Sequence, residues 1–170
     1  MKKLKQIFCL IGNYLPPKLN CYFYKLAGVK FNPSKVWIGN KCYFDTMFPE
    51  NITIQDNVCI SFGVTIVCHF DPTKGIKDHP VNKYKKRVLL EEGVFVGPKS
   101  LLMPGVIIKK NTFVQAGTVV SKTTTENSII CGNPQREKKH LTKNLVSKLN
   151  HNNKNYNFWK VTILLPFMKI

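Results

Sequence analysis

The stretch Leu90-Glu-Glu-Gly-Val-Phe-Val96-Gly-Pro-Lys-Ser-Leu-Leu102-Met-Pro-Gly-Val-Ile-Ile108 decides the fold, because an aliphatic residue returns at every sixth position. The same spacing holds at five further positions, Val114, Val120, Ile54, Ile60 and Ile66. On an α-helix a step of six residues scatters side chains over three directions, so no apolar stripe forms. On extended backbone the step keeps one face, but a strand has only about 3–10 residues. The chain must therefore turn once in every repeat.

The residues between these aliphatic positions supply the turns. We call the aliphatic residues at this six-residue spacing the rungs. The residue three places after a rung is mostly Gly or Asn, which adopt positive φ at little cost: Gly93, Lys99, Gly105, Asn111, Gly117, Asn57 and Gly63. Two places before the rungs are small or β-branched residues: Val88, Val94, Ser100, Val106, Thr112 and Thr118. We therefore predict an all-β solenoid of short parallel strands, in which each repeat buries its neighbour.

Composition indicates one domain with anionic partners. The chain has 170 residues and 44% hydrophobic content, enough for one core. Its net charge is +17, from 26 Lys and Arg against 9 Asp and Glu, which favours phosphates, phospholipid or acidic glycans. Only Arg87 and Arg136 are arginines, and sequence-specific readers of nucleic acid depend on the bidentate guanidinium. We therefore expect no nucleic-acid partner.

The N-terminal segment, residues 1–35, is predicted to be helical. Apolar residues from Leu4 to Leu15 keep a helical spacing that stops before Pro16-Pro17, and this segment lacks the cleavage site of a signal peptide. A second short helix from Leu19 to Leu26 should end at Gly28. We expect the two helices to cap the open end of the coil.

The C-terminal segment, residues 135–170, is predicted to form a basic helix and an apolar tail. Leu141, Leu145 and Leu149 have helical spacing, and the tail Phe158–Ile170 is too short for a membrane span, which takes about 20 apolar residues. The tail is expected either to pack on the protein or to rest at a membrane surface. The six cysteines have no zinc-site spacing, so we expect free thiols and no metal.

Five stretches of the chain, which together cover residues 26–139, resemble the hexapeptide-repeat acyltransferases: Leu26–Lys30, Phe44–Ile52, Gly105–Ile108, Val114–Lys122 and Cys131–Pro134. Relatives in that family include galactoside, maltose, serine and capsule or lipopolysaccharide O-acetyltransferases. The resemblance implies a left-handed parallel β-helix, here over residues 36–134, that forms a homotrimer and uses acetyl-CoA as donor. Periodicity alone does not give the hand of the coil.

His69 is the candidate catalytic residue. It stands where a turn residue is due after Ile66, and there the chain leaves the coil in an excursion over residues 69–87. In the resembling enzymes the histidine at this point is the base, and an imidazole with a pKa near 6.5 suits removal of a hydroxyl proton at neutral pH. A lone histidine is otherwise an ordinary turn or core residue.

Three further residues are candidates around His69. Asp45 or Asp71 could hold the second ring nitrogen of the imidazole. Asp45 could equally bind the acceptor or be a turn residue, and Asp71 could be a plain loop residue. His79 lies in the same excursion and is either a second catalytic residue or part of a His-Pro turn.

The resemblance also implies a donor site. Its residues would be Gly97, Pro98, Ala116, Ser121, Lys122, Pro134, Arg136 and Lys139. In a coil with three six-residue faces, one full turn takes eighteen residues, so Ala116 lies on the same wall as Pro98. The basic side chains of Lys122, Arg136 and Lys139 could neutralise the phosphates of coenzyme A. Alternatively these are corner-packing residues and a solvated basic face. The chain departs from the family where Pro98 lacks an N–H and where Thr123–Glu126 replaces an Asp-x-Pro-Pro bend.

The resemblance therefore predicts an acetyl-CoA-dependent O-acetyltransferase acting on a sugar hydroxyl, and the expected free thiols favour a cytoplasmic location. The Phe44–Ile52 stretch resembles the acceptor side of capsule-type enzymes, which favours a surface polysaccharide and a position at the inner membrane face. Three alternatives remain: a serine-type or other small-molecule acetyltransferase, a non-catalytic scaffold that binds glycan or membrane, and a β-helix carbonic anhydrase. The last needs three histidines on a metal, and the four histidines here are dispersed.

Overall fold

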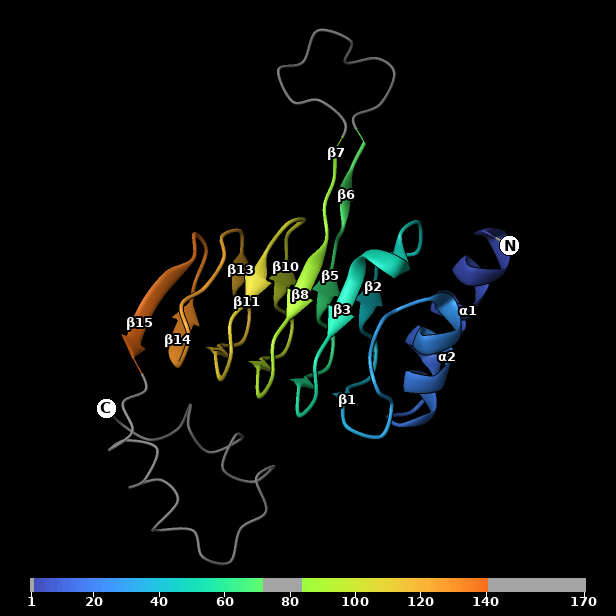
Figure 1. The fold of residues 1–170 in the computed structure, drawn as a ribbon, viewed down its shortest axis with the longest axis horizontal. Helices are drawn as coiled ribbons and strands as arrows, with labels where there is room; N and C mark the ends of the chain where they lie inside the picture. The colour runs from blue at the N-terminus through green and yellow to red at the C-terminus, as the bar shows by residue number, and fades with distance from the viewer. Residues whose placement is uncertain (1, 72–83, 141–170) are drawn as a thin grey trace, which may run out of the picture.

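Short strands wind into a three-sided coil in the computed structural model, which describes residues 2–71 and 84–140 (Figure 1). One wall consists of β1 (Trp37–Ile38), β4 (Cys59–Ile60), β9 (Phe95–Val96), β12 (Phe113–Val114) and β14 (Ser128–Cys131). The second consists of β2 (Tyr43–Phe44), β5 (Thr65–Ile66), β10 (Leu101–Leu102) and β13 (Val119–Val120). The third consists of β3 (Ile52–Ile54), β8 (Val88–Leu90) and β11 (Ile107–Ile108). Within each of these walls the strands are parallel.

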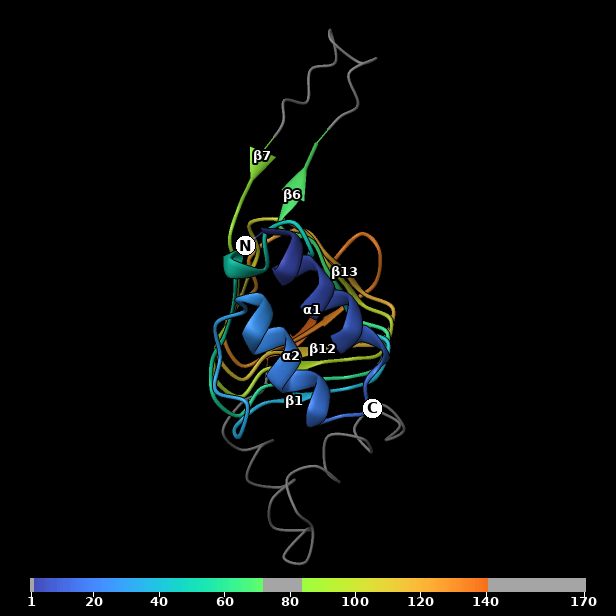
Figure 2. The same ribbon diagram turned by 90° about the vertical axis from the view of Figure 1, so that its right-hand side faces the viewer.

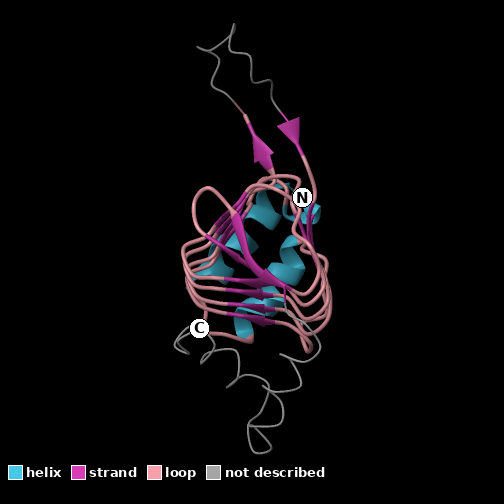
Figure 3. Cartoon of the chain, turned by 90° about the vertical axis from the view of Figure 1, so that its left-hand side faces the viewer, coloured by secondary structure: helices cyan, strands magenta, loops and turns pink. Residues whose placement is uncertain are grey.

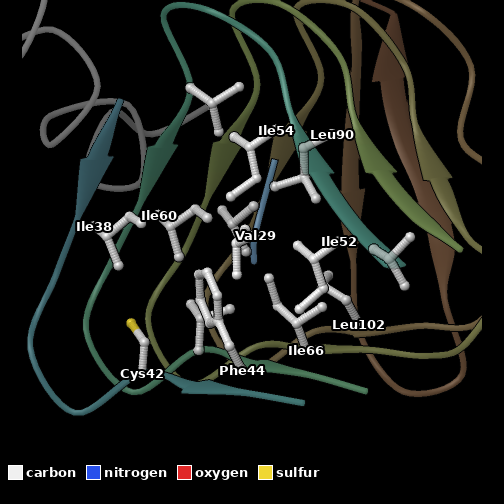
Figure 4. Close-up of a cluster of buried hydrophobic side chains, with 14 of the residues drawn as sticks. Val29, Ile38, Cys42, Phe44, Ile52, Ile54, Ile60, Ile66, Leu90 and Leu102 are labelled. Carbon is white, nitrogen blue, oxygen red and sulfur yellow. The ribbon is translucent and has the colours of Figure 1, made fainter. Parts of the chain in front are cut away.

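The predicted rungs form the core of the coil. Leu102 pairs in register with Ile66 on one side and with Val120 on the other, and all three side chains are buried. Figure 4 shows the aliphatic side chains of successive turns meeting inside the walls. The seven predicted turn residues all have positive φ, between 55° and 91°. The six-residue periodicity therefore predicted both the buried and the turn positions correctly.

Close packing between successive turns makes Gly97, like Gly39, sensitive to substitution. A Cβ on Gly97 would lie 2.6 Å from the Ala116 nitrogen and 2.8 Å from the Gln115 carbon, both backbone atoms. Gly117→Ala meets nothing within 4 Å and is strained only by its φ of +66°. We expect Gly97→Ala to lower the free energy of unfolding by roughly 2–3 kcal/mol through overpacking. Gly117→Ala should cost roughly 1 kcal/mol. Denaturant melts of the two variants test this, and an equal or reversed order would contradict it.

Two helices close the N-terminal end of the coil (Figure 2). They are α1 (Lys2–Tyr14) and α2 (Leu19–Ala27), and α2 ends at Gly28, whose N–H bonds to the Lys25 carbonyl at a φ of 109°. Asn20 of α2 donates its amide to the Ile38 and Gly39 carbonyls, and Tyr24 stacks on Phe44 at 4.3 Å between ring centroids. The helical cap therefore satisfies backbone groups of the first turn as well as covering its apolar end.

The C-terminal end of the coil differs from the prediction. Part of the segment expected as a basic helix is a strand, β15 (Arg136–His140), which runs antiparallel to β14 and is the last strand of that wall (Figure 3). The open edge of β14 needs hydrogen-bond partners, and a charged strand supplies them without inviting another chain. The predicted helix around Leu141–Leu149 and the apolar tail Phe158–Ile170 lie outside the described residues. Among helices in the described part of the chain, none is long and apolar enough to cross a bilayer.

The excursion from the coil begins as a hairpin. β6 (His69–Phe70) pairs antiparallel with β7 (Tyr84–Lys85), and the two strands project from the coil (Figures 1 and 2). His69 was expected at a turn position, but it lies in a strand because the chain extends straight out of the corner instead of bending into the next wall. The Phe70 and Tyr84 rings stack at 5.8 Å and so hold the two strands together.

Candidate active site

Two irregularities of the coil fall at the same corner. Phe44 pairs with Ile66, 22 residues later, whereas Leu102 pairs with Val120 after 18, so the first turn has four extra residues. They lie between β2 and β3, where a 3-10 helix, Pro49–Asn51, precedes β3. The excursion lies between β5 and β8. Because β2 pairs with β5 and β3 with β8, the two insertions stack on each other.

Asp45 is buried at this corner, with 1% of its surface exposed. One carboxylate oxygen, Oδ1, accepts hydrogen bonds from the Met47 and Phe48 backbone N–H groups at 3.0 and 3.1 Å. The other, Oδ2, accepts the Cys68 N–H at 2.7 Å. A buried carboxylate is costly unless it is hydrogen-bonded, and these three donors hold it in one orientation.

His69 completes the hydrogen bonding of this carboxylate. Its Nδ1 lies 2.6 Å from Asp45 Oδ2, and its side chain is 21% exposed. A carboxylate accepts, so Nδ1 carries the proton, and in the neutral ring Nε2 is then the basic nitrogen. The Phe48 ring packs edge-on against the imidazole at 5.2 Å between centroids. Ring orientation and tautomer are therefore both fixed, as a general base requires.

Strand β7 brings a positive charge to the same corner. Lys85 is the cross-strand partner of His69, and its Nζ lies 4.6 Å from the centroid of the Phe48 ring. A cation over an aromatic face is attracted by the ring quadrupole. Phe48 thus contacts both the imidazole and the lysine, and an anionic group bound beside His69 would find Lys85 near it.

The thiols near the site are unsuited to act as nucleophiles. Burial, with a smaller contribution from the charge of Asp45, raises the pKa of Cys68, the residue before His69, to about 12. Burial likewise raises the pKa of Cys9 to about 12, again with a contribution from Asp45. A thiol reacts as its thiolate, so both cysteines stay inert near neutral pH. The imidazole is therefore the better candidate for a proton-transfer group at this corner.

Of the other candidates around His69, only Asp45 is placed by the described residues in contact with the imidazole. Asp45, one of the two expected carboxylates, holds Nδ1, while Asp71 has an exposed side chain two residues further along. His79 lies outside the described residues. Within residues 2–71 and 84–140, no group of three or more His, Cys, Asp or Glu side chains could hold a metal ion.

Three of the predicted donor residues meet at a different corner. Gly97 packs against the backbone of Ala116, and the Pro98 carbonyl accepts the Gly117 N–H at 2.8 Å. Ala116 is exposed and Pro98 half-buried, so the corner presents a small side chain beside a ring. It joins β9 to β10 and β12 to β13, whereas His69 follows β5. Within one chain, the predicted donor wall and the imidazole lie at separate corners.

The other predicted donor residues gather near the C-terminal end of the coil. The backbone N–H groups of Ser121 and Lys122 both donate to Gln135 Oε1 at 3.0 Å. Pro134 precedes that glutamine, and Arg136 is exposed at the start of β15. Lys139 is placed by its register with Ile129 in β14.

Sequence reasoning missed three residues of these sites. Gln135 ties the Ser121 loop to the final turn of the coil, and only its position after the Cys131–Pro134 motif could have signalled it. Phe48 lies in the Phe44–Ile52 stretch, but its packing on His69 needs the four-residue insertion. Lys85 was one of several lysines in the excursion, and only strand pairing brings it opposite His69.

Comparison with known proteins identifies relatives along most of the chain. A galactoside O-acetyltransferase of Lactococcus lactis is 27% identical over 162 residues, which cover 91% of this chain and 73% of that enzyme. The protein CapG of Staphylococcus aureus is 34% identical over 155 residues, which cover 84% of this chain and 90% of CapG. Among solved structures, a hexapeptide-repeat acetyltransferase of Vibrio cholerae matches with a TM-score of 0.60 at 15% identity, over 84% of this chain and 91% of that one. No protein-family model matches.

These relatives and the coil of six-residue repeats together define the class of protein as an acyltransferase. More particularly, the chain belongs to the hexapeptide-repeat acetyltransferase family.

Proposed function

We propose that the protein is an acetyl-CoA-dependent O-acetyltransferase that modifies a sugar hydroxyl, with His69 as general base. The observation that carries the proposal is the 2.6 Å contact between His69 Nδ1 and the buried Asp45 carboxylate. It leaves the basic Nε2 as the nitrogen that can accept a proton. The pair lies where the excursion leaves the coil, the place at which a regular solenoid has room for a substrate.

The reaction needs one proton acceptor and no covalent intermediate on the enzyme. His69 Nε2 takes the proton of the sugar hydroxyl as its oxygen attacks the thioester carbonyl of acetyl-CoA. The tetrahedral intermediate then collapses and expels the thiolate of coenzyme A. The imidazolium of His69 gives its proton to this thiolate. The products are the acetyl ester and the free thiol, and the imidazole returns to its neutral form. Asp45 stabilises the imidazolium and keeps its orientation.

The two corners of the coil support a homotrimer with active sites between subunits. His69 follows β5, while Gly97, Pro98 and Ala116 lie at the neighbouring corner. In a cyclic trimer of left-handed coils, the imidazole of one subunit faces the donor wall of the next, and three equivalent grooves result. Pantetheine would then pass the small side chain of Ala116. Lys122, Arg136 and Lys139 would neutralise the phosphates of the nucleotide part.

The acceptor is proposed to be a saccharide of a surface polysaccharide. The similarity to a galactoside O-acetyltransferase and to CapG supports a sugar, and Lys85 beside Phe48 supports an acceptor that carries negative charge. The net charge of +17 suits a cytoplasmic enzyme working on a lipid-linked, anionic intermediate at the inner membrane face.

An acceptor screen tests the function. The purified protein is incubated with acetyl-CoA and a panel of free sugars, nucleotide sugars, lipid-linked oligosaccharides and serine, and thiol release is followed. We expect release that depends on a saccharide, with an ester in the product by mass spectrometry. Release with serine alone would indicate the small-molecule alternative. Absence of thiol release with every acceptor, together with tight glycan binding, would favour the scaffold and overturn the proposal.

A further inference from the structure

The helical cap exposes many large apolar side chains on both of its helices. Its eight large apolar side chains are exposed by between 39% and 88%: Leu4, Ile7, Leu10, Ile11 and Tyr14 of α1 with Leu19, Tyr22 and Leu26 of α2. In α1 these residues recur at intervals of three and four, so they share one side of the helix. We call this set the outer face of the cap.

The cap does not need this face for its own packing. The opposite side of α1 buries Cys9 and brings Gly12 against the Tyr24 ring, where an added Cβ would meet ring atoms at 3.2 Å. Tyr24 in turn packs on Phe44 of the coil. Terminal units of solenoid proteins usually carry a polar outer face, which keeps them soluble. An apolar outer face therefore points to a second surface that covers it.

The charge around the outer face selects the partner. Residues 1–44 contain eight lysines and no Asp or Glu, since the first carboxylate of the chain is Asp45. Lys3 and Lys18 are exposed in the same segment, as is Lys25, whose Nζ also donates to the Phe31 carbonyl at 2.7 Å. A second copy of the protein, docked through the same face, would bring the same positive charge against this surface. The repulsion between the lysines would oppose such a dimer. An anionic phospholipid surface matches both properties, because lysines meet its phosphates while apolar side chains enter the headgroup boundary.

We propose that the outer face of α1 and α2 docks the protein peripherally on an anionic bilayer. The helices lie across one end of the coil, and the hairpin β6–β7 projects sideways from it, so docking of that end leaves the walls of the coil free (Figure 2). The inference goes beyond acetyl transfer and holds whether or not the sugar is the acceptor. It assigns the contact to the helical cap, not to the tail Phe158–Ile170.

Vesicle sedimentation of the full chain tests the docking surface. Wild-type protein is mixed with vesicles of phosphatidylcholine alone or with an equal part of phosphatidylglycerol, at low and at physiological salt. We expect binding to the phosphatidylglycerol vesicles, at least about tenfold weaker binding without the anionic lipid, and weakening by salt. The double variant Ile7→Ser/Ile11→Ser should lose at least about tenfold in affinity, because two side chains no longer enter the interface.

Matched variants separate this surface from others. Phe62→Ser removes a side chain that is 50% exposed on the coil and should bind vesicles as wild type does. Unchanged binding by the Ile7/Ile11 variant would overturn the proposal, as would loss of binding only in a Phe158→Ser/Trp159→Ser tail variant. Light scattering without lipid provides a further check. A smaller oligomer in the Ile7/Ile11 variant would identify the face as a protein interface and also overturn the proposal.

Discussion

His69→Ala is expected to lower kcat for acetyl transfer by about 10²–10⁴-fold, the usual contribution of a positioned general base. The variant removes the only imidazole that the described residues bring to Asp45. Without it the sugar hydroxyl must lose its proton to water, while donor and acceptor binding are largely retained. Initial rates of thiol release, compared with those of wild type at saturating acetyl-CoA, give the ratio.

Folding of the His69→Ala protein should change little. The side chain is part of a strand that leaves the coil, and it makes its hydrogen bond at the edge of the core. A hydrogen bond to a charged group is worth about 1.5–3 kcal/mol, but Asp45 keeps its three backbone N–H donors, so the melting temperature should fall only moderately and the oligomeric state should stay that of wild type. His79→Ala is the matched control, and we expect it to retain activity. Activity lost in His79→Ala but kept in His69→Ala would transfer the role of base to His79.

The coil was predictable because its determinants are local. A six-residue step of aliphatic residues fixes which side chains point inward, and Gly or Asn three places later fixes the turn. Even Lys99, neither Gly nor Asn, has a φ of 55°, since the repeat imposes the turn on whichever residue stands there. The strand β15 was not predictable, because Arg-Glu-Lys-Lys-His has no apolar alternation, and only the open edge of β14 makes it extended.

The site was predictable only in part, because it depends on register between turns. Asp45 and His69 are 24 residues apart, and they meet because a four-residue insertion and the excursion occupy one corner. The sequence left both Asp45 and Asp71 as candidates for holding the imidazole, with Asp71 more readily interpreted as a loop residue. The pairing of β2 with β5 brings Asp45 to His69, so Asp45 is the carboxylate that holds the imidazole. That pairing cannot be read from residue spacing in the sequence.

Asp45→Asn is expected to lower kcat by about 10²–10⁴-fold with little change in KM for the acceptor, because it changes the tautomer of His69. The substitution replaces one carboxylate oxygen by an NH₂ group. If that group faces Cys68 and His69, it donates to Nδ1, and the ring proton moves to Nε2, which can then no longer accept. If it faces Met47 and Phe48, two buried backbone N–H groups lose their acceptor.

Both orientations of the introduced amide also lower stability, so the readouts must be separated. An unsatisfied buried donor costs about 1–3 kcal/mol, and the Asp45→Asn variant should melt below wild type. Asp56→Asn is the matched control, because it removes one charge of an exposed pair with Lys35 at 2.7 Å, and such solvent-exposed pairs contribute little to stability. Kinetics are measured well below both melting points, and ¹⁵N chemical shifts of labelled histidine report the tautomer.

A raised KM with unchanged kcat would instead make Asp45 an acceptor-binding residue. The wild-type tautomer combined with wild-type kcat would remove Asp45 from the mechanism, because the carboxylate would then act only as a structural anchor for the corner.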